Sequence, residues 1–342
     1  MNVNRQVVLV TRPQGIPQAE HFAIVESPVP QPEDGQILVR NIYLSVEPAM
    51  RGWVSTESNY ADPVPIGATM RSFATGRVQV SRHPDFQPGD YVTGWFGWQD
   101  YASVDPASVE RTITETDVPL STSLGVLGLN GFTAYFGLIE AGQPRPGETV
   151  LVSTAAGAVG SCVGQIATIM ECRAVGIAGG PDKTKLCTDE FGFAAAIDYK
   201  ADNLDAAIAE ACPDGVDVYF DNTAGAISDT VMNHLGIGAR VVVCGTAAIA
   251  SWIPAPVGPR VERHLLVKRA RMQGILTIDY QDRFDAARLD LARWVREGRL
   301  QYREEVLAGL DQAPDAIAGL YRGENMGKRL IRIATDDALS SM

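Results

Sequence analysis

A turn of small residues near the middle of the chain has the composition of a phosphate-binding site. It follows the apolar run 150–152 and contains Gly157, Ala158, Val159 and Gly160. Glycines at such a strand-to-helix turn let backbone N–H groups and the positive end of the helix meet the pyrophosphate of a dinucleotide. Ala155 replaces the first glycine of the G-x-G-x-x-G fingerprint, so the motif alone is only moderately specific. A tight turn without a ligand is the alternative interpretation.

The residues after the next apolar run favour NADP over NAD. A dehydrogenase specific for NAD usually places an acidic residue there for the ribose 2′-hydroxyl, but residues 175–180 contain none. Lys183 and Lys185 follow instead, and a cation at this point can bind a 2′-phosphate through charge-assisted hydrogen bonds. The opposing interpretation is that these lysines are the solvated first turn of a helix, and the neighbouring Asp182 weakens the case for a phosphate.

The chain lacks the residues of a zinc-dependent dehydrogenase or of a nucleophilic hydrolase. No cysteine precedes residue 161, and His21 and His83 stand in no metal-ligand pattern. A G-x-S-x-G nucleophile elbow is also missing. Hydride transfer remains, because a nicotinamide cofactor itself carries that chemistry.

The middle of the chain has the rhythm of βαβ units, in which short apolar runs alternate with helical patterns. The expected strands are 149–153, 174–178, 195–199, 216–221, 240–245 and 272–277, and the expected helices are 159–170, 183–191, 204–212, 226–235 and 283–298. Nearly continuous apolar strands are typical of a parallel sheet buried on both faces. The pattern predicts an α/β fold with a Rossmann-type, doubly wound parallel sheet.

The remainder of the chain predicts a second domain that is mainly β. Short β-type runs at 36–40, 76–80 and 90–94 are separated by segments rich in proline and glycine, and 328–333 is a plausible last strand. A chain of 342 residues is long enough for two domains. We expect a discontinuous β-rich domain of residues 1–127 and 304–342, with the NADP-binding domain inserted at 128–303.

Composition excludes several other classes of protein. The net charge is −12, and the longest basic cluster, 267–271, is short enough to be a solvated entrance to a strand, so nucleic acid is not an expected partner. The apolar run 7–10 is far shorter than a signal or membrane segment. Five cysteines without paired spacing indicate free thiols. We therefore expect a cytoplasmic protein without membrane or metal partners.

Several longer segments match one known group of proteins over nearly the whole chain. They are residues 43–52, 128–138, 146–180, 196–200, 218–222, 243–245, 268–274 and 325–328. In these segments the sequence resembles the zinc-free, NADP-dependent enone reductases of the medium-chain dehydrogenase/reductase superfamily, which include prostaglandin and leukotriene reductases, plant double-bond reductases and bacterial curcumin reductase. The resemblance implies a GroES-like β domain, a Rossmann domain and a homodimer. It also implies reduction of the carbon-carbon double bond of α,β-unsaturated ketones and aldehydes.

The resemblance also implies which residues hold the cofactor. Residues 157–160 would bind the pyrophosphate, and Lys183 and Tyr199 the 2′-phosphate. The nicotinamide side would be lined by Asn222, Cys244, Gly245 and the strand residues Ile275, Leu276 and Thr277. Asn325 would reach the cofactor from the C-terminal segment.

Two positions depart from the group and bear on the substrate. Ala49 and Ala250 stand where relatives commonly have tyrosines, which implies a wider and more apolar pocket that Trp53 and Trp252 would help to line. If a tyrosine donor is lost, Tyr60, Trp252 or Tyr280 could replace it. Quinone reduction, oxidation of a secondary alcohol on a lipid, and NADPH binding without catalysis remain alternative hypotheses.

Overall fold

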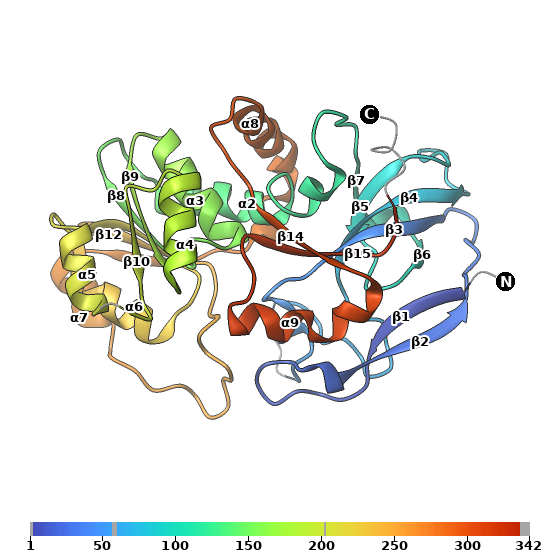
Figure 1. The fold of residues 1–342 in the computed structure, drawn as a ribbon, viewed down its shortest axis with the longest axis horizontal. Coiled ribbons are helices and arrows are strands. Elements are labelled where there is room, and N and C mark those ends of the chain that lie inside the picture. The colour runs from blue at the N-terminus through green and yellow to red at the C-terminus, as the bar shows by residue number, and fades with distance from the viewer. Residues whose placement is uncertain (1–2, 57–59, 202, 336–342) are drawn as a thin grey trace. The chain divides into compact units, whose positions relative to one another are not determined.

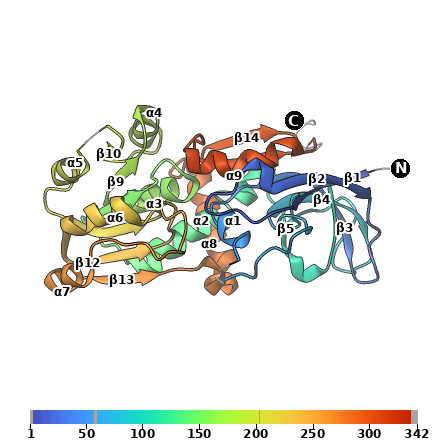
Figure 2. The ribbon, with the colours of Figure 1, turned by 90° about the horizontal axis from the view of Figure 1, so that it is seen from below.

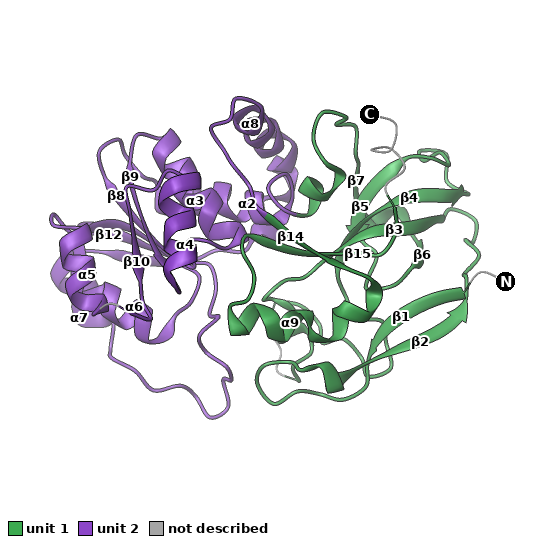
Figure 3. Ribbon diagram, in the orientation of Figure 1, with its two compact units in different colours: residues 1–124, 304–342 green, residues 125–303 purple. Residues whose placement is uncertain are grey.

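The computed structural model describes residues 3–56, 60–201 and 203–335. The chain divides into two compact units, which Figure 3 shows in separate colours. Unit 1 consists of Met1–Leu124 and Glu304–Met342, and unit 2 of Gly125–Arg303. None of the helices formed by the described residues is long and apolar enough to cross a membrane.

Unit 2 is built on a six-stranded, entirely parallel sheet with the strand order β10-β9-β8-β11-β12-β13, of which β8, β9, β10 and β12 are labelled in Figure 1. The strands are β8 (Thr149–Ser153), β9 (Arg173–Ala178), β10 (Ala195–Asp198), β11 (Val216–Asp221), β12 (Leu235–Val243) and β13 (Arg271–Gly274). All residues of β8 are buried, as a central parallel strand with both faces covered requires. The chain leaves β8 toward β9 and returns to β11 on its other side, so β8 and β11 flank the switch point where such sheets bind ligands.

Helices cover both faces of this sheet. They are α2 (Leu129–Phe136), α3 (Ala158–Ile169), α4 (Pro181–Lys185), α5 (Leu204–Ala211), α6 (Gly225–Val231), α7 (Glu262–Lys268) and α8 (Phe284–Arg296), with π-helical turns at Gly137–Gly142 and Leu186–Glu190 and 3-10 turns at Met232–His234 and Thr277–Arg283. On one face, Ile208 of α5 and Val231 of α6 pack with Leu151 and Tyr219. On the other, Gly137 lies against the ring of Phe220. The predicted α/β, doubly wound fold is confirmed.

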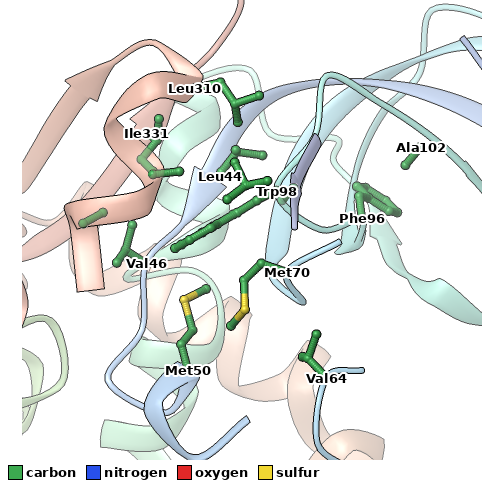
Figure 4. Close-up of a cluster of buried hydrophobic side chains, with 14 of the residues drawn as sticks. Leu44, Val46, Met50, Val64, Met70, Phe96, Trp98, Ala102, Leu310 and Ile331 are labelled. Atoms are coloured by element: carbon green, nitrogen blue, oxygen red, sulfur yellow. The ribbon is translucent and has the colours of Figure 1, made fainter. Parts of the chain in front are cut away.

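Unit 1 is mainly antiparallel. Its larger sheet has the order β14-β15-β3-β4-β5-β7, with β6 paired to β3, and β1 and β2 form a separate ribbon. The elements are β1 (Val3–Leu9), β2 (Phe22–Pro28), β3 (Ile37–Ser45), α1 (Met50–Trp53), β4 (Phe73–Ser81), β5 (Tyr91–Trp95), β6 (Tyr101–Val104), β7 (Val109–Thr112), β14 (Glu304–Ala308), α9 (Ala313–Arg322) and β15 (Lys328–Arg332), with 3-10 turns at Ala19–His21, Pro106–Ser108, Leu120–Leu124 and Leu310–Gln312. Figure 4 shows its core, in which Trp98 lies among Leu44, Val46, Met70 and Ile331.

Two sequence expectations are wrong in detail. Strand β13 ends at Gly274, so Ile275, Leu276 and Thr277 lie beyond it, although the Ile275 N–H still donates to the Val243 carbonyl at 3.1 Å. Helix α7 was not expected, and the basic cluster 267–271 is the end of this helix followed by the first residue of β13, with Arg269 in the left-handed region between them. Figure 2 shows α7 beside β12 and β13.

Candidate cofactor site

The turn between β8 and α3 forms a tight cradle at the carboxyl edge of the unit 2 sheet. Thr154 has a positive φ of 55°, and its carbonyl accepts the Gly157 N–H at 2.9 Å. A Cβ atom on Gly160 would overlap the Thr154 carbonyl oxygen, so only glycine allows the helix to approach the turn this closely. Gly157, Ala158, Val159 and Gly160 thus lie at the start of α3, as a pyrophosphate site requires.

Ala155 fits the turn because of a glycine on the neighbouring strand. Ala155 is fully buried, and its N–H donates to the Ile177 carbonyl of β9 at 3.0 Å. A Cβ atom on Gly176 would lie 2.6 Å from the Ala155 methyl group. The space that the missing fingerprint glycine would have left is therefore supplied by Gly176.

The N-terminus of α3 suits an anion. Within the described residues no side chain caps this helix end, and its first turn contains no acidic residue. The first N–H groups of a 12-residue helix are left without intrahelical partners, and the helix dipole adds positive potential there. The cradle therefore fits the pyrophosphate of a dinucleotide.

The tips of β9 and β10 hold the residues predicted for the 2′-phosphate. Lys183 lies in α4, which begins directly after Gly180, and the Tyr199 ring packs on Gly179. Sequence reasoning missed Asp198, whose Oδ1 accepts the Gly180 N–H at 2.8 Å and joins the two strand tips. The signal that could have revealed it is an acidic residue at the end of an apolar run.

A buried carboxylate organises the ends of β11 and β12. Asp221 accepts hydrogen bonds from the Ser228 hydroxyl at 2.6 Å and from the backbone N–H groups of Thr223 and Ala224, both at 2.9 Å. The Asp221 carbonyl accepts the N–H groups of Cys244 and Gly245 at 2.8 and 3.1 Å. Asp221 was not among the predicted residues, because its role comes from contacts across two strands.

This network brings Asn222, Cys244 and Gly245 together, as the sequence predicts for the nicotinamide side. Asn222 Nδ2 donates to the Ser153 carbonyl at 2.7 Å, and its N–H donates to the Ser153 hydroxyl at 2.8 Å. A Cβ atom on Gly245 would lie 3.0 Å from the Asn222 carbonyl oxygen. Burial, and then the nearby charge of Asp221, raises the pKa of the Cys244 thiol to about 12, so this thiol is neutral at pH 7.

The segment after β13 lies in the same unit. Ile275 is buried beside Gly137, and the Thr277 hydroxyl forms a 2.5 Å hydrogen bond with the Thr133 hydroxyl of α2. Tyr280 stacks on Phe136 at 4.7 Å between ring centroids, with an interplanar angle of 8°. Its ring therefore packs against α2 and not against Trp53 or Trp252, which were predicted to line the substrate pocket.

The other predicted residues are spread over both units. In unit 1, Ala49 precedes α1, Trp53 is buried at the end of this helix, Tyr60 is half exposed, and Asn325 Nδ2 donates to the Gly327 carbonyl at 2.8 Å. In unit 2, Ala250 and Trp252 lie in the exposed segment between β12 and α7. Trp53 meets Trp95 edge to face at 5.6 Å, a contact that the sequence does not reveal.

The described residues form no group of three or more His, Cys, Asp or Glu side chains that could hold a metal ion. All five cysteines are free, and four of them are buried. Burial raises the pKa of Cys162 to about 12, that of Cys187 to about 12 and that of Cys212 to about 11.

Comparison with known proteins agrees with this arrangement. Family models match residues 5–112, as the N-terminal domain of an oxidoreductase, and residues 158–293, as a zinc-binding dehydrogenase. The chain is 43% identical to the NADPH-dependent curcumin reductase of Escherichia coli K12, over 98% of each protein. It belongs to the zinc-free enone reductases of the medium-chain dehydrogenase/reductase superfamily. Membership confirms the resemblance predicted from the sequence.

Two further members of this superfamily bear on the site. The NADP-dependent 2-alkenal reductase of Nicotiana tabacum is 35% identical over 97% of this chain and 98% of its own length. The crystal structure of CurA from Vibrio vulnificus in complex with NADPH matches with a TM-score of 0.92 and 40% identity, over 97% of this chain and all of that one. The chain therefore shares its fold and much of its sequence with a protein whose crystal structure contains NADPH.

Proposed function

We propose that this protein uses NADPH to reduce the carbon-carbon double bond of α,β-unsaturated ketones and aldehydes. The observation that carries the proposal is the sequence similarity, over nearly the whole chain, to NADP-dependent double-bond reductases. The turn between β8 and α3 also forms a cradle that suits a dinucleotide. NADPH supplies the hydride for the β-carbon of the enone, and a proton is then added at the α-carbon.

The chain's own residues bind and orient the reactants. Residues 157–160 hold the pyrophosphate, Lys183 and Tyr199 the adenosine 2′-phosphate, and Asn325 contributes from the C-terminal segment. The Asn222, Cys244 and Gly245 cluster, fixed by Asp221 and Ser153, lines the nicotinamide together with Ile275, Leu276 and Thr277. The cluster is tied by hydrogen bonds within the protein itself, so it is already ordered to align the nicotinamide with the substrate, and such alignment lowers the barrier.

The substrate that suits this chain is a bulky apolar enone. Ala49 and Ala250 leave room that larger side chains would fill, and Trp53 and Trp252 supply apolar surface. A donor is still needed for the developing enolate oxygen, since one such hydrogen bond is worth about 3 kcal/mol of barrier. Tyr60 and Trp252 are the stronger candidates, because Tyr280 is held as a stacked wall of α2.

The protein acts as a homodimer in the cytoplasm. Strand β13 is an edge of the unit 2 sheet, and Met272 on this strand is 39% exposed, while Leu266 on the preceding helix α7 is 79% exposed. An exposed edge strand with apolar side chains near it is suited to pairing with another chain. Five free thiols suit a reducing compartment.

The test is NADPH consumption by the purified protein with alkenals, aryl enones, cyclic and steroidal enones, and quinones, with the products measured by mass spectrometry. NADH serves as the control cofactor, and reverse assays with NADP⁺ and secondary alcohols test the lipid-alcohol hypothesis. Saturated ketones or aldehydes formed with a strong preference for NADPH support the proposal. Hydroquinones alone, ketones from alcohols alone, or NADPH binding without turnover would favour the corresponding alternatives.

A further inference from the structure

A lysine that follows β10, Lys200, lies against the end of β9, which Lys183 also follows. Gly179 directly follows β9, and a Cβ atom built on it would lie 3.0 Å from Cε of Lys200 and 2.9 Å from Cε1 of Tyr199. The stem of Lys200 and the ring of Tyr199 thus both lie on Gly179. The Lys200 ammonium, one bond beyond Cε, therefore lies near the strand tip, and no ion pair among the described residues involves it.

Asp198 at the end of β10 fixes this arrangement. Its Oδ1 accepts the Gly180 N–H at 2.8 Å and the Lys200 N–H at 3.0 Å. One carboxylate therefore sets the direction of the chain at both strand tips. The two backbone N–H groups that donate hydrogen bonds to Asp198 also stabilise the negative charge of its carboxylate.

We propose that Lys200 is a second cation for the 2′-phosphate of NADPH, and that Asp198 is the positioning residue that holds it there. The inference rests on the proposed use of NADPH. In a doubly wound sheet the adenosine ribose lies at the carboxyl end of the second strand, which is β9. Because Gly179 has no side chain, Tyr199 and Lys200 can both lie against the chain at this strand end.

Charge explains why a second lysine is useful. The chain has a net charge of −12, which opposes the approach of a cofactor with three phosphate groups. A 2′-phosphate monoester carries nearly two negative charges at pH 7. Lys183 on α4 and Lys200 after β10 together balance that charge and discriminate against NADH, which lacks the 2′-phosphate.

Isothermal titration calorimetry with NADPH, NADH and adenosine 2′,5′-bisphosphate tests this assignment without enzyme turnover. For Lys200→Ala we expect binding of NADPH and of the bisphosphate to weaken about ten- to a hundredfold, as for the loss of one charged hydrogen bond. NADH binding should stay within about twofold, and Lys200→Arg should restore NADPH binding. The matched control is Arg263→Ala, which removes an exposed positive charge from α7, a helix beside β12 and away from the tips of β9 and β10.

The role of Asp198 is tested by a double-mutant cycle. Asp198→Ala should weaken NADPH binding alone but add less than about twofold in the Lys200→Ala background, because both changes act through one ammonium. Fully additive losses would overturn the positioning role. Unchanged NADPH binding by Lys200→Ala, or equal losses for NADPH and NADH, would overturn the role of Lys200.

These outcomes are separable from failure of the proposed function. If the wild-type protein binds the bisphosphate through Lys200 but reduces no enone, only the enone assignment fails. If it reduces enones with NADPH while Lys200→Ala binds both cofactors as the wild type does, only the Lys200 assignment fails.

Discussion

Ala155 and Gly176 form a complementary pair in the phosphate-binding turn, and this pair makes a residue-level prediction. Gly176→Ala alone should destabilise the protein by about 1–3 kcal/mol, because the new methyl group would lie 2.6 Å from that of Ala155. Gly176→Ala should also weaken NADPH binding, because it distorts the phosphate-binding turn. Adding Ala155→Gly should recover part of the stability and restore NADPH affinity. Unfolding midpoints and NADPH titrations of the two single variants and the double variant measure the coupling, and strictly additive effects would contradict the pairing.

Substitution of Tyr280 tests whether this residue only packs against α2 or also donates a hydrogen bond to the enolate oxygen. Because its ring stacks on Phe136, Tyr280→Phe should keep kcat within about twofold, whereas Tyr280→Ala loses a stacking contact worth about 1 kcal/mol. Steady-state kinetics with an aryl enone decide the matter. A loss of kcat of a hundredfold or more in Tyr280→Phe would make its hydroxyl the donor.

Asp100, which directly precedes β6, connects β1 and β3 of unit 1 and makes a prediction about pH at the level of the elements. Arg5 of β1 donates to Asp100 Oδ2 at 2.8 Å, and Arg40 of β3 lies 3.2 Å from Oδ1. Burial alone would raise the pKa of this carboxyl, but the hydrogen bonds from Arg5 and the charge of Arg40 outweigh it, so the pKa is lowered. The ionised carboxylate therefore stabilises the folded state above its unfolded pKa, and this contribution is lost as pH falls through the folded pKa.

We expect Asp100→Asn to reduce stability by about 2 kcal/mol at pH 7, with the difference from wild type shrinking in acid. Thermal unfolding at several pH values measures it. The matched control is Asp34→Asn, which breaks an exposed pair with Arg82 and should change little. A difference that grows as pH falls would contradict the sign.

The strands of unit 2 could be predicted well where packing and sequence pattern agree. The expected strands 149–153 and 216–221 coincide with β8 and β11, because continuous apolar runs are what a sheet covered on both faces needs. Helix α7 escaped prediction since none of its residues is buried, which leaves no apolar periodicity to detect. The end of β13 was placed too late because Ile275 is apolar and buried although it lies outside the strand.

The candidate site was predictable in its motifs but not in its supporting contacts. The spacing of Gly157 and Gly160 is visible in the sequence. The roles of Asp221 and Lys200 depend on contacts with residues that are distant in the sequence. Gly176 compensates for Ala155 across two strands, which no local motif can show. Contacts between strand ends can be predicted only when the order of the strands in the sheet is known.

At the scale of the whole molecule, we predict that the protein is a homodimer. Light scattering should give twice the chain mass of 36.7 kDa, because we propose that the exposed β13 edge pairs with a second copy. Met272→Glu on this strand should shift the protein toward monomer by placing like charges in the interface. A wild-type monomer at micromolar concentration would contradict the proposed dimer.

Enone reduction by hydride transfer to the β-carbon is the central claim for the molecule. It is tested most directly by reacting an aryl enone with NADPH that carries deuterium at both positions of nicotinamide C4, followed by mass spectrometry and NMR of the product. The proposed reaction predicts a saturated ketone with one deuterium on the β-carbon. An allylic alcohol with deuterium on the carbonyl carbon, or a saturated product without deuterium on the β-carbon, would contradict it.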